Sequence, residues 1–145
     1  MQVKIKRIDT DLPLPTYETA GAIGFDLLAR EETTIQPGEI ALIPGNVIVE
    51  TPDGYAFLVA SRSSTPKKKG LMMPHGVGVI DQDYCGPADE VKIQVKNFRD
   101  KPVTIARGDK VAQGLFVRAD RLDFVEVDGI DRETRGGFGS TGGHA

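Results

Sequence analysis

The sequence has no tryptophan, one cysteine, two histidines and no long apolar run. Cys85 alone cannot form an internal disulfide, and no stretch reads as a signal peptide or a membrane span, so we expect a cytoplasmic protein. His75 and His144 give little support for a histidine-based metal site or a Ser-His-Asp triad. The formal charge of −3 supplies no basic surface for nucleic acid, so no nucleic-acid or membrane partner is expected.

The chain of 145 residues is expected to form a single globular unit rich in turns, because it contains 17 glycines and 9 prolines. Apolar and polar residues alternate at 3–6 and 91–96, which is typical of half-buried strands. Short apolar runs between turn formers predict further strands at 40–43, 47–49, 55–60, 111–117 and 122–127. This spacing predicts an all-β fold, a jelly-roll-like antiparallel β-barrel, with at most one short helix near 62–71.

The composition changes at Gly129, where the segment GIDRETRGGFGSTGGHA begins. We therefore expect a β-barrel domain over residues 1–128 and a flexible, glycine-rich arm over residues 129–145. Such a segment is either a frayed terminus or an arm that binds a ligand. Four side chains suited to binding lie close together in this segment: Arg135, Phe138, Ser140 and Thr141. Its glycines would also let backbone amides approach a phosphate.

Residues 61–64, Ser-Arg-Ser-Ser, directly follow the apolar run 55–60. One interpretation is a serine-rich turn that caps a helix. The other is a cradle for a phosphate or an oxyanion, since hydroxyls, consecutive amides and a guanidinium gather at the end of a strand. Gln113 similarly places a polar side chain in an otherwise apolar segment. Both interpretations stay open at this point.

The stretch GVGVIDQDYCG at 76–86 brings two carboxylates to the end of an apolar run. On a straight strand Asp81 and Asp83 would share a face and repel each other, so at least one must leave the strand or meet a cation. The stretch is either a polar turn between strands or a strand that delivers a carboxylate as a general base for water.

Five motifs taken together resemble the homotrimeric dUTP pyrophosphatase (dUTPase) family. They occur in the order of that family and span nearly the whole chain: AGAIGFDLLA at 20–29, SRSS at 61–64, GVIDQDYCG at 78–86, RGDKVAQG at 107–114 and RGGFGSTGG at 135–143. The resemblance implies a β-clip fold and a homotrimer with three active sites at subunit interfaces. It implies hydrolysis of dUTP to dUMP and pyrophosphate, which limits uracil incorporation into DNA and supplies dUMP for thymidylate synthesis.

The resemblance also implies roles for individual residues. Asp81 corresponds to the aspartate that activates water at the α-phosphate, and Tyr84 to the ring beneath the deoxyribose. Main-chain groups around Gly78 would pair with uracil. Asp26 corresponds to the aspartate that holds, through water, a Mg²⁺ ion chelated by the triphosphate. The remaining residues would hold the phosphates or close over the nucleotide: Arg62, Ser63, Ser64 and Gln113 in the domain, and Arg135, Phe138, Gly139, Ser140 and Thr141 in the arm.

Two other functions fit parts of the pattern. A dCTP deaminase of the same fold is one, but Gln94 stands three residues before Asn97, where that family carries a catalytic glutamate. The other is a β-barrel trimer that binds a nucleotide without cleaving it. Asp81 distinguishes this possibility, because only an enzyme needs it as a base.

The motifs also depart from the usual dUTPase pattern, since Ser64 replaces a glycine, His75 stands where asparagine is frequent, and residues 86–89 lengthen the turn after Tyr84.

Overall fold

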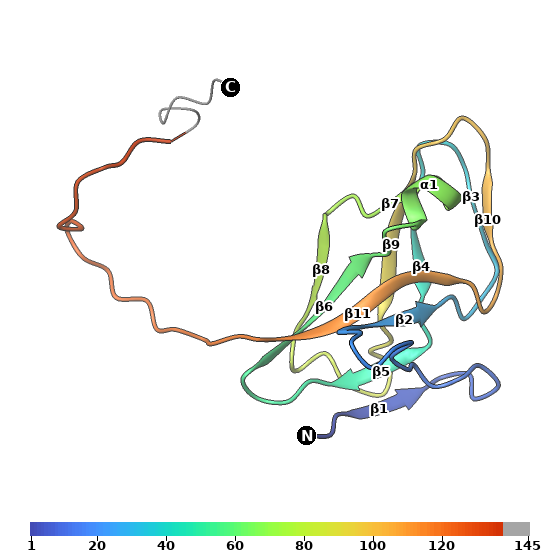
Figure 1. Cartoon of the computed structure of the whole chain (residues 1–145), viewed down its shortest axis with the longest axis horizontal. Coiled ribbons are helices and arrows are strands. Elements are labelled where there is room, and N and C mark those ends of the chain that lie inside the picture. Colours follow the sequence, from blue (N-terminus) through green and yellow to red (C-terminus); the bar gives the residue numbers. More distant parts are fainter. Residues whose placement is uncertain (138–145) are drawn as a thin grey trace.

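A computed structural model describes residues 1–137 of the chain and shows strands with one short helix as far as residue 118 (Figure 1). The strands are β1 (Lys4–Arg7), β2 (Gly24–Leu28), β3 (Thr33–Ile35), β4 (Ile40–Pro44), β5 (Val47–Glu50), β6 (Tyr55–Ser61), β7 (Leu71–Met72), β8 (Val77–Ile80), β9 (Lys92–Asn97), β10 (Val103–Ile105) and β11 (Lys110–Arg118). The helix, α1, covers Thr65–Lys69, within the predicted range. The all-β prediction is confirmed. Among the described residues, no helix is long and apolar enough to cross a membrane.

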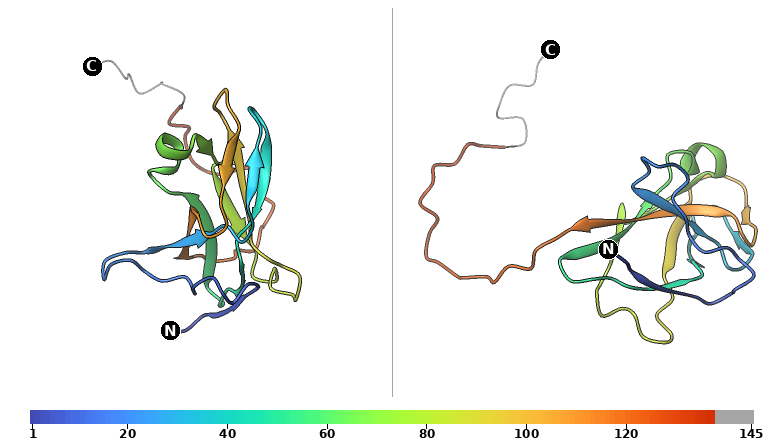
Figure 2. Two further views of the ribbon diagram at one scale, coloured as in Figure 1. Left: turned by 90° about the vertical axis from the view of Figure 1, so that its right-hand side faces the viewer. Right: turned by 60° about the horizontal axis from the view of Figure 1, so that its bottom comes forward.

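The strands pair antiparallel in four sheets. The largest has the order β2-β11-β6-β8, a second has the order β4-β9-β7, and β1-β5 and β10-β3 form two-stranded sheets. Figures 1 and 2 show these sheets folded around a common interior. Within residues 1–137 the hydrogen-bonded strands do not close into a continuous ring, so the fold is jelly-roll-like rather than a closed barrel.

Aromatic rings from neighbouring strands fill part of this interior. Phe57 and Phe116 are stacked at 5.1 Å between ring centroids, and Phe25 lies 5.9 Å from Phe57. Gly114 makes this packing possible, because a Cβ there would lie 2.7 Å from the rings of both Phe25 and Phe57. The core thus requires a glycine in the middle of β11, where the sequence alone gives no reason for one.

Three turns that precede strands contain glycines with positive φ, a conformation that side chains disfavour. The φ angles are 77° at Gly38, 75° at Gly54 and 87° at Gly108. These turns set where the adjoining strands begin, so the observed bounds of β4, β6 and β11 differ from the predicted runs by no more than one residue at each end.

One predicted strand, at 122–127, is wrong. After β11 ends at Arg118, the described chain runs away from the sheets without strand structure (Figures 1 and 2). Its apolar side chains are exposed, and Phe124 is fully so at 101%. Alternation of side chains favours a strand, but a strand also needs a hydrogen-bonding neighbour, and the described residues of this chain provide none here. The predicted boundary between a domain and an arm at residue 129 stays a prediction.

Candidate active site

A cavity of about 250 Å³ opens where β2, β11 and β6 lie side by side, close to the end of β6. Strand register places Gln113 of β11 opposite both Asp26 of β2 and Ala60 of β6. The cavity is lined by residues from three of the five motifs together with one further carboxylate: Gly24, Asp26, Arg62, Ser63, Ser64, Gln113 and Glu18. Five predicted site residues from three separate segments of the chain therefore share one cavity.

Asp26 faces this cavity because of the alternation along β2. Phe25 and Leu27 point into the core, so the residue between them points to the other side of the sheet. One carboxylate oxygen of Asp26 lies 2.7 Å from Arg62 Nε, and the other lies 2.8 Å from Lys110 Nζ. Asp26 thus holds the Arg62 guanidinium at the cavity wall, where it is suited to bind an anion.

Gln113 and the two serines add polar groups to the same cavity. Gln113 donates from Nε2 to the Ser61 carbonyl at 3.0 Å, which leaves its side-chain oxygen free of this bond. Gly24 gives that oxygen room, since a Cβ at position 24 would lie 2.7 Å from it. Ser64 occupies the N-cap position of α1 but makes no side-chain capping hydrogen bond. The Ser64 hydroxyl is therefore not engaged in capping the helix, and Ser64 lines the cavity.

Sequence patterns did not single out Glu18 and Lys110. Lys110 Nζ donates hydrogen bonds to the carboxylates of Asp26 and Glu18. Both bonds raise the pKa of Lys110 above its ordinary value, and the bond to Asp26 has the larger effect. Glu18 lies in a loop and Lys110 begins β11, so only the folded chain brings them together. Ion pairs thus link a row of alternating charges, and all of its members except Lys110 line the cavity: Glu18, Lys110, Asp26 and Arg62.

Asp81 lies elsewhere, at the edge of a different cavity of about 500 Å³. β8 ends at Ile80, and the Tyr84 N–H donates to the Asp81 carbonyl at 3.1 Å, so residues 81–84 form a turn. Gln82 fixes this turn by donating to the carbonyl oxygens of Pro52 at 3.3 Å and Tyr55 at 3.1 Å. The stretch is therefore a turn that directly follows a strand. The role of Asp81 as a general base stays a prediction.

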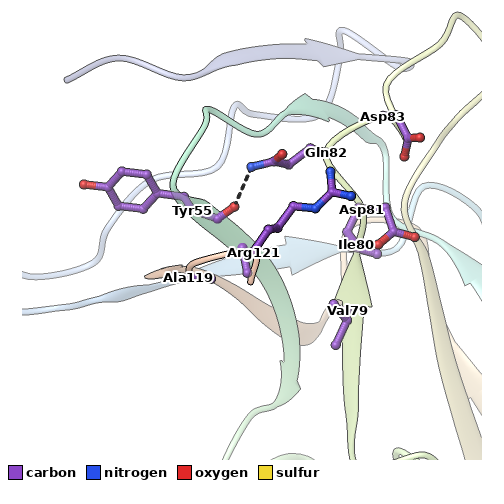
Figure 3. A pocket seen from close by; sticks show the side chains of 9 residues that line it. Tyr55, Val79, Ile80, Asp81, Gln82, Asp83, Ala119 and Arg121 are labelled. Atoms are coloured by element: carbon purple, nitrogen blue, oxygen red, sulfur yellow. Dashed lines mark hydrogen bonds between the residues drawn. The ribbon is translucent and has the colours of Figure 1, made fainter. Parts of the chain in front are cut away.

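The Asp81 carboxylate is exposed and makes no hydrogen bond or ion pair with the described residues. Figure 3 shows it at the end of β8, with the Arg121 side chain extending toward it from the chain that follows β11. Asp83 lies farther along the turn, separate from Asp81 (Figure 3). The repulsion expected on a straight strand is therefore avoided, because both carboxylates lie beyond its end.

Asp81 and the Arg62 cavity lie at opposite ends of β6. Ile80, which precedes Asp81, pairs with Phe57 near the start of β6, whereas Arg62 follows its last residue. Phe57 and Arg62 are five residues apart in extended chain, which amounts to about 17 Å. A single chain therefore does not bring its predicted base to its predicted phosphate-binding residues.

Gly78 and Tyr84 are near Asp81 in the chain and are well suited to their predicted contacts. β8 is the outermost strand of its sheet. The main-chain N–H and C=O groups on its outer edge, around Gly78, are therefore not paired with another described strand. A Cβ at Gly78 would lie 3.3 Å from His75 Nε2 and from Val59 Cβ, so the strand passes tightly over these side chains. Tyr84 is 37% exposed.

Arg135 is the only predicted site residue of the arm that lies within the described residues 1–137, and it is exposed. Phe138, Gly139, Ser140 and Thr141 lie outside the described residues. The structure therefore contributes nothing to their roles, which stay predictions.

A Mg²⁺ ion held through water fits the donors of the Asp26 cavity. Mg²⁺ keeps several of its waters and is commonly bound by one or two carboxylates together with substrate phosphates. Asp26 and Glu18 supply two carboxylates there. Residues 1–137 contain no cluster of three or more acidic, histidine or cysteine side chains that would hold a metal directly. The donor set thus suits an outer-shell site that a triphosphate completes.

Comparison with known proteins identifies the family. The dUTPase family model matches residues 10–142. The chain belongs to the dUTPase family. It is 40% identical to a deoxyuridine 5'-triphosphate nucleotidohydrolase of Thermobifida fusca over 100% of this chain and 81% of that protein, and 39% identical to one of Methylocella silvestris over 100% and 94%.

Solved structures of dUTPases share the fold. A crystal structure of dUTPase from Streptococcus mutans matches with a TM-score of 0.76 at 38% identity, over 83% of this chain and 98% of that one. The dUTPase of phage phi11 of Staphylococcus aureus matches with a TM-score of 0.80 at 22% identity, over 91% and 100%, and supports the fold alone. The dUTPase resemblance of the sequence motifs is thereby confirmed.

Proposed function

We propose that the protein, a dUTPase that hydrolyses dUTP to dUMP and pyrophosphate, does so in a site that two or more copies of the chain build together. The cavity that joins Asp26, Arg62, Ser63, Ser64 and Gln113 carries this proposal. It combines a guanidinium, hydroxyls and an amide, which together suit a chain of phosphates. The relatives named above are deoxyuridine 5'-triphosphate nucleotidohydrolases, which points to dUTP as the nucleotide.

Asp81 acts as the general base in this proposal. Its carboxylate accepts a proton from a water molecule, the water oxygen attacks the α-phosphorus, and the bond to the leaving pyrophosphate breaks. Arg62 and the serine hydroxyls stabilise the negative charge on the phosphate oxygens during this step. No covalent intermediate with the protein is required.

Asp26 and Glu18 would hold the waters of a Mg²⁺ ion bound to the triphosphate. The ion would neutralise phosphate charge, and Lys110 and Arg62 keep the Asp26 carboxylate oriented toward the cavity. The structure of the phage phi11 dUTPase is described as revealing the coordination of a structural Mg(II) ion. That ion belongs to the phage protein and is no more than a precedent for metal binding in this fold.

A homotrimer resolves the separation of Asp81 from the Arg62 cavity, because Asp81 of one copy can meet the cavity of another across an interface. The exposed apolar side chains after β11 support assembly, since a chain rarely leaves so many in water: Leu122, Phe124, Val125, Val127 and Ile130.

A cytoplasmic location is part of the same proposal and rests on the single Cys85.

The substrate is tested by measuring pyrophosphate release from dUTP, dCTP, dTTP and UTP, with and without Mg²⁺. We expect rapid release from dUTP, with Mg²⁺ increasing the rate, and much slower release from the other three. Fixed main-chain groups that pair with uracil would be left unpaired by cytosine, at a cost of roughly 1 to 3 kcal/mol for each buried group. Release of ammonia from dCTP would instead identify a deaminase, and binding of dUTP without cleavage would identify a non-catalytic protein.

Truncation before Arg135 tests the arm. The variant should keep its melting temperature, because no described strand or core residue lies beyond β11, and its oligomeric state, because the exposed apolar residues between 122 and 130 are retained. Its turnover of dUTP should fall, since the predicted phosphate and base contacts of the arm are lost and water is no longer excluded. Light scattering and steady-state kinetics measure the two properties. An unchanged rate would show that the arm is only a terminus.

A further inference from the structure

The Tyr84 side chain is fixed at its hydroxyl end. The hydroxyl donates to the main-chain carbonyl oxygen of Glu90 at 3.1 Å, while the ring stays partly exposed. The loop between the two residues is closed on itself, because Asp89 accepts the Gly86 N–H at 2.7 Å and the Glu90 N–H donates to the Ala88 carbonyl at 2.9 Å. The orientation of the ring therefore depends on where the main chain of Glu90 is held.

Glu90 is held by a buried network of charges. Only 6% of the residue is exposed. Its carboxylate accepts two hydrogen bonds from Arg30, at 2.8 and 3.1 Å, one from Lys92 at 3.0 Å and one from the Asn46 N–H at 2.9 Å. Burial acts to raise the pKa of Glu90, but these hydrogen bonds outweigh it and hold the pKa below its ordinary value.

The partners of Glu90 come from separate parts of the fold. Arg30 follows β2, Asn46 lies between β4 and β5, and Lys92 begins β9. A carboxylate tied to three elements in this way fixes its own main chain more firmly than a loop residue normally is. The carbonyl that receives the Tyr84 hydroxyl is thus part of the rigid core of the protein.

We propose that Glu90 is a positioning residue for sugar selection, which it performs through Tyr84. The inference rests on the proposed function, in which the Tyr84 ring packs beneath the deoxyribose and leaves no room for a 2′-hydroxyl. The Glu90 network anchors the carbonyl, the carbonyl anchors the Tyr84 hydroxyl, and the hydroxyl keeps the ring in place against the sugar. When either connection is lost, the ring can move aside and a ribonucleotide fits.

The test compares the ratio of kcat/KM for dUTP to kcat/KM for UTP in two variants. Tyr84→Phe keeps the ring and removes only the hydroxyl, while Glu90→Gln keeps the shape of the side chain and removes its charge. We expect each to lower the ratio about 10-fold, because a difference of one small group typically changes selectivity about 10- to 200-fold. Tyr17→Phe is the matched control, since the Tyr17 hydroxyl makes no hydrogen bond with the described residues and its side chain is exposed.

Binding of non-hydrolysable dUTP and UTP analogues, measured by calorimetry, should show the same loss of preference without depending on turnover. A purely structural role of Glu90 would lower the melting temperature and leave the ratio unchanged, which would overturn the inference. If Glu90→Gln does not fold, Tyr84→Phe decides, because it leaves the charge network intact. A parent protein that cleaves no dUTP would instead refute the proposed function. A parent that prefers dUTP, together with an unchanged ratio in Tyr84→Phe, would refute only the role of Glu90.

Discussion

Replacement of Asp81 by asparagine is expected to lower kcat for dUTP hydrolysis by about 10²- to 10⁴-fold, the usual contribution of a general base. Asparagine has nearly the same shape as aspartate but cannot accept the proton of water. Because Asp81 is exposed and has no bonding partner among the described residues, its replacement should leave the fold and the melting temperature unchanged. Pyrophosphate release under saturating dUTP measures the effect.

Asp83→Asn is the matched control for this experiment. It makes the same chemical change two residues away in the same turn, where the carboxylate is also exposed (Figure 3). We expect the Asp83 variant to keep most of its activity and the Asp81 variant still to bind a non-hydrolysable dUTP analogue. Equal turnover by Asp81→Asn and the parent protein would remove Asp81 from the mechanism, and equal losses in both variants would point to the charge of the turn rather than to a base.

Local sequence patterns predicted most of the larger strands because alternation and turn residues are properties of neighbouring positions. The short strands β3 and β10 were not predicted, since three residues are too few to show a period, and these strands exist because they pair with each other. β2 and β7 were not predicted either. The run at 122–127 failed for the opposite reason. It has the pattern of a strand but no partner among the described residues of its own chain.

The candidate site shows a similar division. The motifs indicated Asp26, Arg62 and Gln113, and the pairing of β2, β11 and β6 brings them into one cavity. Glu18 and Lys110 could not be predicted, because their ion pair joins segments that are far apart in the sequence. The distance between Asp81 and Arg62 could not be predicted from the sequence either, since it is set by the register between β6 and β8 rather than by any motif.

Two inactive variants are expected to restore activity when they assemble together. Asp81→Asn removes the proposed base, and Arg62→Ala removes a proposed phosphate contact while Lys110 still pairs with Asp26, so neither change should disturb the fold. Each variant alone should be nearly inactive, because every site in its trimer lacks one group. In a trimer that contains both kinds of chain, one interface joins an intact Asp81 to an intact Arg62, so about one site in three should work.

The experiment requires co-expression of the two variants with different affinity tags and purification through both tags in turn, so that only mixed assemblies remain. Asp81→Asn chains that carry both tags provide the control and should show no recovery. If the 17 Å or so along β6 is instead closed by movement within one chain, every site in the mixed trimer carries one of the two changes. Activity would then stay at the level of the single variants, and the idea of a site shared between chains would have to be abandoned.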